Sequence, residues 1–161
     1  MYRIVLTAMA LVIALADCSS SKRVYSSNGT TVTTDNNQKT VTVESSEGTM
    51  KMGQGVVDVA SLGVPIYAGA TQDEGALSVT GARGTAQMAA FTTSDSFDQV
   101  YGFYKAKMPA GSEKMKVDEA DSSMAEFVLG NGKVGQMQTV VMISKKGDKT
   151  SIVITKGTEG Q

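Results

Sequence analysis

One helical pattern constrains the fold of this 161-residue chain most, because the other periodic segments alternate as β-strands do. Residues 95–108 carry apolar side chains three and four positions apart, which predicts one long amphipathic helix with a single buried face. Ser94 or Asp95 can cap its first turn, and Pro109 ends it. Gly102, in the middle of this segment, predicts a close approach of the helix to a sheet.

Strand patterns stand on both sides of this helix. Residues 76–80 and 85–92 precede it, and four more strands are expected at 113–117, 124–129, 136–144 and 150–155. The run Val140–Ile143 is apolar at every position, which predicts a central strand. The order ββαββββ predicts an α+β fold, in which one long amphipathic helix packs across a largely antiparallel β-sheet.

The rest of the chain divides into smaller segments. β-Branched residues separated by turn residues predict a small β-meander over residues 30–53. The α+β domain is then expected over residues 54–156, with a short tail at 157–161.

The N-terminus has the pattern of an export signal. Arg3 is followed by an uncharged, mostly apolar run of 13 residues from Ile4 to Ala16. A membrane-spanning helix needs roughly 20 such residues, so this run fits a signal peptide over residues 1–17 better. Ala14-Leu15-Ala16 matches the cleavage site of an ordinary secretory signal.

A second interpretation of the same segment depends on the single Cys. Leu15-Ala16-Asp17-Cys18 resembles the signal of bacterial lipoproteins, although Asp17 stands where that family has a small residue. The resemblance implies that Cys18 is lipidated and becomes the first mature residue. The polar residues 18–29 would then form a flexible tether to the membrane. In the lipoproteins that this signal resembles, the residue after the Cys influences sorting, and Ser19 at that position implies the outer membrane facing the periplasm. A soluble periplasmic or secreted protein is the alternative.

Composition excludes several kinds of site. The chain contains no His and one Cys, so it has no Ser-His-Asp triad, no internal disulfide and no thiolate zinc site. Its net charge of −1 gives no electrostatic reason to bind nucleic acid. The acidic cluster at 118–121 is interpreted as a solvated turn. We therefore expect no metal, no cofactor and no enzymatic activity.

Two candidate binding surfaces follow from the side chains that are left. Most of the eight methionines after Cys18 are interpreted as core residues, because Met fills irregular gaps. Three side chains could instead line an apolar groove between helix and sheet: Met88, Tyr104 and Met115. Seven lysines could form one basic surface for an anionic lipid or glycan: Lys105, Lys107, Lys114, Lys116, Lys145, Lys146 and Lys149.

Residues 42–105 carry a further resemblance. Val64-Pro65-Ile66-Tyr67-Ala68-Gly69-Ala70 and the helical segment ending in Phe103-Tyr104-Lys105 resemble motifs of uncharacterised bacterial exported proteins and lipoproteins. Ala68 stands where that group has Pro. The resemblance implies an envelope location and a shared fold. From the residues, we expect Val64, Ile66 and Tyr67 to insert into the core.

These observations favour a non-enzymatic envelope lipoprotein. It would be held by a lipid anchor and would present its α+β module to an unknown envelope protein or glycan. The alternative is a periplasmic carrier that binds an apolar small molecule or lipid in the groove.

Overall fold

The computed structural model describes residues 22–158, apart from 83, 120–121, 131–132 and 134. The first half contains β1 (Lys22–Ser27), β2 (Thr30–Asp35), β3 (Thr40–Ser45), β4 (Gly48–Gly53), the short 3-10 helix η1 (Val59–Leu62), β5 (Thr71–Gln72) and β6 (Leu77–Gly81). The second half contains β7 (Gly84–Thr93), α1 (Phe97–Lys107), β8 (Glu113–Glu119), β9 (Ser122–Leu129), β10 (Met137–Lys146) and β11 (Lys149–Thr158).

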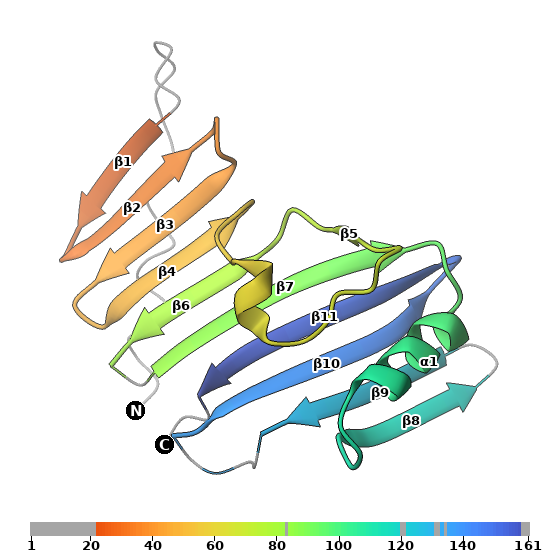
Figure 1. The fold of residues 1–161 in the computed structure, drawn as a ribbon. Helices are drawn as coiled ribbons and strands as arrows, with labels where there is room; N and C mark the ends of the chain where they lie inside the picture. The colour runs from red at the N-terminus through yellow and green to blue at the C-terminus, as the bar shows by residue number, and fades with distance from the viewer. Residues whose placement is uncertain (1–21, 83, 120–121, 131–132, 134, 159–161) are drawn as a thin grey trace.

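All the strands belong to one antiparallel sheet. Ten of them lie in the order β1-β2-β3-β4-β6-β7-β11-β10-β9-β8, and β5 pairs with β7 beside the end of β6. Figure 1 shows this sheet as a single open layer with β1 at one edge and β8 at the other. The largely antiparallel α+β fold that the sequence predicts is therefore confirmed.

Both helices pack on the same face of the sheet, which we call the covered face (Figure 1). The core lies beneath them and consists of alternate residues from β7, β9, β10 and β11. Phe91, Ile152, Ile143 and Ala125 stand opposite one another in successive pairings, and each is at most 3% exposed. Burial of these branched and aromatic side chains is the main stabilising contribution that the described core makes.

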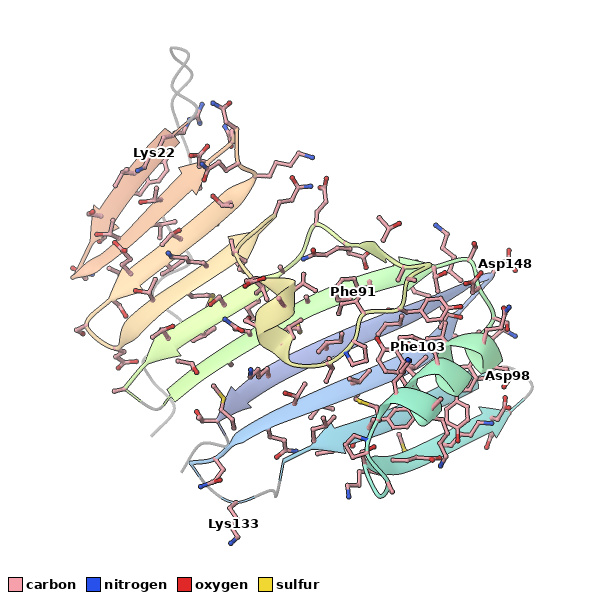
Figure 2. The ribbon with its side chains drawn as sticks, in the orientation of Figure 1. Lys22, Phe91, Asp98, Phe103, Lys133 and Asp148 are labelled. Atoms are coloured by element: carbon pink, nitrogen blue, oxygen red, sulfur yellow. The ribbon has the colours of Figure 1, made fainter. Side chains whose placement is uncertain are left out.

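The segment around Pro65 completes this core, as the sequence predicts. Val64 is buried, and Ile66 and Tyr67 pack against the core cluster. The Tyr67 ring meets Phe103 of α1 edge-on with the ring centres 5.3 Å apart. Figure 2 shows Phe91 and Phe103 on the same side of the sheet, between β7 and α1.

The helix is shorter than predicted. It has 11 residues, because Ser96 forms a capping box with Gln99 and Met108 already has extended backbone. The cap is Ser96, not Ser94 or Asp95. A Cβ added at Gly102 would meet nothing within 4 Å, so the close approach expected there is wrong.

The order ββαββββ also omits part of the sheet. Residues 22–27, which we expected within the tether, form β1 and pair along their whole length with β2. The expected meander is not a separate unit, because β4 pairs with β6 through five residue pairs. The last strand continues through Thr158, two residues into the expected tail. Sequence patterns did not predict η1 or β5.

Candidate functional site

The side of the sheet opposite α1 and η1, which we call the open face, differs in composition from the covered face. Residues that stand directly opposite each other in an antiparallel pair point to the same side, so the pairings assign each side chain to a face. Phe127, Val141 and Ile154 stand in one row on the covered face. Their chain neighbours Val128, Val140 and Val153 therefore point to the open face.

Apolar side chains continue across the open face through nearly every strand. One row of paired residues contains Val41, Met52, Leu77, Met88, Thr155, Val140 and Val128. The next row, two residues away along each strand, contains Tyr25, Val32, Val43, Met50, Val79 and Ala86. The row on its other side contains Ala90, Val153, Met142, Glu126 and Met115.

Methionine is concentrated on this face. Six of the eight methionines after Cys18 point to it: Met50, Met52, Met88, Met115, Met124 and Met142. Four of them are 37–42% exposed, whereas Met108 is the one buried methionine of the described core. The expectation that most methionines fill the core is therefore wrong. Met is a flexible apolar side chain that is common on adaptable binding surfaces.

Charged residues of the open face lie toward its margins. Arg23 stands on the edge strand β1, in the row of Val41. Glu126 and Glu119 lie on β9 and β8, at the opposite side of the sheet. Lys146 and Lys149 face each other at the hairpin between β10 and β11. The middle of the face, from β3 to β11, carries no charged residue in these three rows.

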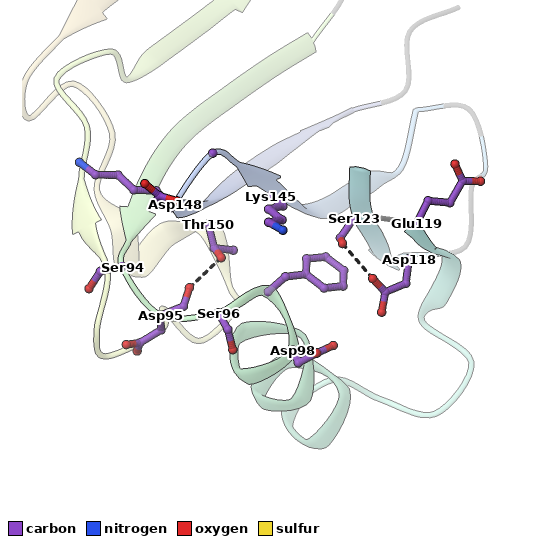
Figure 3. Close-up of a pocket in the computed structure, with 13 residues that line it drawn as sticks. Ser94, Asp95, Ser96, Asp98, Asp118, Glu119, Ser123, Lys145, Asp148 and Thr150 are labelled. Atoms are coloured by element: carbon purple, nitrogen blue, oxygen red, sulfur yellow. Dashed lines mark hydrogen bonds between the residues drawn. The ribbon is translucent and has the colours of Figure 1, made fainter. Parts of the chain in front are cut away.

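A second candidate site is a polar hollow of about 630 Å³ at the N-terminal end of α1. Figure 3 shows Lys145 and the carboxylates of Asp98 and Asp118 around it, with residues from β8, β9 and the β10–β11 hairpin. The capping box of α1 contributes Ser96.

Two of the hydroxyl groups that line this hollow donate hydrogen bonds within the chain. Ser123 donates to an Asp118 carboxylate oxygen at 2.9 Å, and Thr150 donates to the Asp95 carbonyl at 2.7 Å. Thr150 therefore has a backbone carbonyl as its partner, while Ser123 has a carboxylate for which no orienting third group is seen among the described contacts. Among the described residues, no group of three or more acidic, His or Cys side chains could hold a metal ion.

The three residues of the expected apolar groove do not come together. Tyr104 is fully buried on the covered face, where its ring lies 6.3 Å from the Phe127 ring. Met88 pairs with Thr155 and Met115 with Glu126, so both point to the open face. Burial raises the pKa of Tyr104 to about 12, an effect partly offset by the backbone of Tyr67. A packed tyrosine therefore occupies the place of the expected groove.

The seven lysines do not form one continuous surface. Lys105 and Lys107 lie in the last turn of α1, whereas Lys145 and Lys149 line the hollow beside its first turn. A helix of 11 residues separates these groups by about 16 Å. Lys114 donates to the Gly111 carbonyl at 3.0 Å, and Lys146 lies at the β10–β11 hairpin.

Two of these lysines are engaged in local contacts. Lys116 lies 4.5 Å from the centre of the Tyr101 ring and 3.6 Å from an Asp118 oxygen. Lys105 donates to Glu113, which also accepts a hydrogen bond from the Tyr101 hydroxyl at 3.0 Å. This pairing lowers the pKa of Glu113 and raises the pKa of Lys105. These contacts hold α1 against β8.

The proposed lipidation site, Cys18, and the proposed signal peptide lie outside the described residues. No helix in the described part of the chain is both long and apolar enough to cross a membrane.

Sequence reasoning missed the open face because it treated each strand alone. The available signal was the odd spacing between methionines and core residues within a strand, because residues an odd number of positions apart point to opposite faces. Met142 is one residue from Ile143, and Met88 is three residues from Phe91. Met50-Lys51-Met52 shows the same period directly. Strand order and register decide which of these outward-facing residues become neighbours, and only the paired sheet joins them into one surface.

Comparison with known proteins does not place the chain in a family: no family model, no curated protein and no solved structure gives a significant match.

Proposed function

We propose that this chain is a non-enzymatic interaction protein of the bacterial cell envelope, held at the membrane through a lipid on Cys18. Its binding surface is the open face of the sheet. The signal-like N-terminus supports the anchor, and the face itself supports the binding role.

The observation that carries the binding role is the continuous apolar surface across β2 to β9. An antiparallel sheet exposed to water on one side normally alternates apolar and polar residues, with the polar residues facing water. Here the side that α1 and η1 leave open carries Val, Leu and Met in the middle and charges toward the margins. Large exposed apolar patches with polar rims are typical of interaction sites.

The open face is more favourable than the polar hollow as the functional surface. In the hollow, the Ser123 and Thr150 hydroxyl groups already donate hydrogen bonds within the chain. The side chains of the open face pack on neither helix of the described part of the chain. This supports binding rather than catalysis.

Site-specific photocrosslinking tests the surface. A photoreactive side chain at Met50 points to the open face, whereas one at Lys51 points to the covered face of the same strand. Both positions are exposed, so they form a matched pair. In intact cells we expect an adduct from position 50 and none from position 51. No adduct from position 50, or equal yields from both, would contradict the proposed surface.

Intact mass tests the anchor separately. We expect the membrane fraction to contain a chain that begins at Cys18 and carries added acyl mass, and Cys18→Ala to abolish that species. A soluble chain that begins at Asp17 without added mass would refute the anchor. An adduct of lipid mass at position 50 would support the carrier alternative instead.

A further inference from the structure

Neither of the two helices in the described part of the chain packs on the open face of the sheet, and the area and charge of this face indicate what binds there. A partner for this face presupposes the proposed function, in which the same face is the binding surface.

The first requirement is a second layer. A domain buries each apolar sheet face against another layer. In β2, β3 and β4 the covered-face side chains are mostly Thr with Lys51 and Glu44, whereas the open-face side chains are mostly Val and Met. The helices α1 and η1 cannot provide this layer, because they lie on the covered face. An apolar sheet face is matched best by another apolar sheet face, as in aligned β-sandwiches.

The second requirement is area. Ten strands about 4.8 Å apart span about 43 Å, and five residues of strand span about 17 Å. The open face therefore covers about 730 Å² of plane on each chain. A stable protein interface buries about 800 Å² on each partner. The corrugated surface of one open face is large enough to supply that area.

The third requirement is self-complementarity, because an interface between identical chains is built from the same patch twice. The middle of the strand order falls between β6 and β7. A two-fold axis that runs there, parallel to the strands, places the β1 side of one copy over the β9–β8 side of the other. Arg23 of one copy then lies within one row of Glu126 of the other, and the uncharged central rows meet each other.

We infer that the open face binds the open face of a second copy of this chain, forming a two-layer sandwich around a Met- and Val-rich centre. Flexible methionine side chains allow two apolar sheet faces to interdigitate without a unique packing arrangement. The covered faces, with α1 and η1, then point outward on both sides.

Thiol crosslinking in intact envelopes tests this arrangement. Val79 lies on β6 beside the proposed axis and points to the open face, while its neighbour Thr80 is exposed on the covered face. Packed sheets lie about 10 Å apart, which exceeds the reach of a direct disulfide, so a short bis-maleimide is the suitable reagent. The unaltered chain, treated in parallel, reports any crosslink through Cys18.

We expect Val79→Cys to give a covalent dimer of about twice the mass of the processed chain, and Thr80→Cys to give none. Equal dimer yields from both variants would show random collision and would overturn the inference. No dimer from Val79→Cys would also overturn it. Val79→Cys crosslinked to a different protein would overturn the second copy as partner but leave the proposed binding surface in place.

A measurement of mass in solution provides the second readout. We expect the detergent-extracted chain to sediment as a dimer, Met142→Lys to shift it to the monomer mass, and Lys51→Met to leave it dimeric. Met142 is 37% exposed, so lysine can be placed there without burying a charge in the folded monomer. A monomeric unaltered chain, or a dimeric Met142→Lys chain, would contradict the proposed interface.

Discussion

Tyr67 connects the segment around Pro65 to Asp95, which lies just before α1. Its hydroxyl donates to an Asp95 carboxylate oxygen at 2.7 Å, and the Asp95 carbonyl accepts the Thr150 hydroxyl at 2.7 Å. The bond to Asp95 is the main reason that the pKa of Tyr67 is raised. Asp95 therefore connects the segment to β11.

We expect Tyr67→Phe to lower the free energy of unfolding by about 1 kcal/mol, because it removes this hydrogen bond and keeps the ring. Urea denaturation measures the change. Tyr25→Phe is the matched control, since Tyr25 is 54% exposed on β1, and it should change stability by less than about 0.5 kcal/mol. Equal effects from the two variants would show that the bond to Asp95 contributes nothing.

Glu113 gives the protein a defined pH dependence. Its pKa is lowered chiefly by Lys105, so its stabilising contribution is present above the ordinary value of 4.5 and is lost as pH falls through the lower folded value. The pKa of Lys105 is raised by the same contact, so that contribution is present below 10.5 and is lost as pH rises through the higher folded value.

We therefore expect Glu113→Gln to be less stable than the unaltered chain between these limits and to approach it well below pH 4.5. Glutamine retains an acceptor for the Tyr101 hydroxyl, so the comparison isolates the charge. Urea unfolding of both chains at neutral and acidic pH measures the difference. A difference that stays constant with pH would contradict the assignment.

At the scale of elements, Gly102 is a weak point of α1. A Cβ at this position would meet nothing within 4 Å, and the residue is exposed. We expect Gly102→Ala to raise the free energy of unfolding by about 1 kcal/mol through helix propensity. Thermal unfolding measures it.

Gly48→Ala is the informative contrast at the same scale. Gly48 begins β4 with φ +146°, and an added Cβ would lie 2.2 Å from the Thr80 carbonyl oxygen of β6. Alanine there must push β4 away from β6, so we expect a loss of stability. A stabilising Gly48→Ala would contradict the close contact between Gly48 and Thr80. A destabilising Gly102→Ala would contradict the open space around Gly102.

The positions of the helix and strands along the chain were easier to predict from the sequence than the order and pairing of the strands in the sheet. The strands from 76 onward and the helix come from local periodicity, and their positions in the structure lie within a few residues of the predicted ones. β10 lies between β11 and β9, in agreement with its apolar run. Strand β1 was missed because its polar sequence Lys22–Ser27 has no apolar alternation and is held by pairing with β2. The open face was missed for a related reason, since it exists only after registers align.

At the scale of the whole molecule, the two halves of the sheet are stabilised unequally. α1 contacts β9, β10 and β11, and η1 contacts β11, while β1 to β4 lie beyond this cover. Local opening is easiest where few apolar groups are buried. We therefore expect amide exchange in the monomer to be slowest in β7, β10 and β11 and to become faster toward β1.

Association through the open faces changes this gradient in a specific way. The proposed two-fold axis places β3, β4 and β6 of each copy over β10, β11 and β7 of the other, respectively. Dimerisation therefore covers the less stable half of one sheet with the more stable half of the other. Protection in β3 and β4 should then rise with chain concentration, because binding stabilises the bound state by mass action. Hydrogen exchange followed by mass spectrometry over a range of concentrations measures it.

Met142→Lys is the control for this effect: in that variant, exchange in β3 and β4 should be fast at every concentration. Exchange beneath α1 should hardly change, since that core is complete within one chain. Concentration-independent protection of β3 and β4 in the unaltered chain would mean that the first half of the sheet is stable alone. The apolar open face would then be a surface for a different partner, not the centre of a symmetric sandwich.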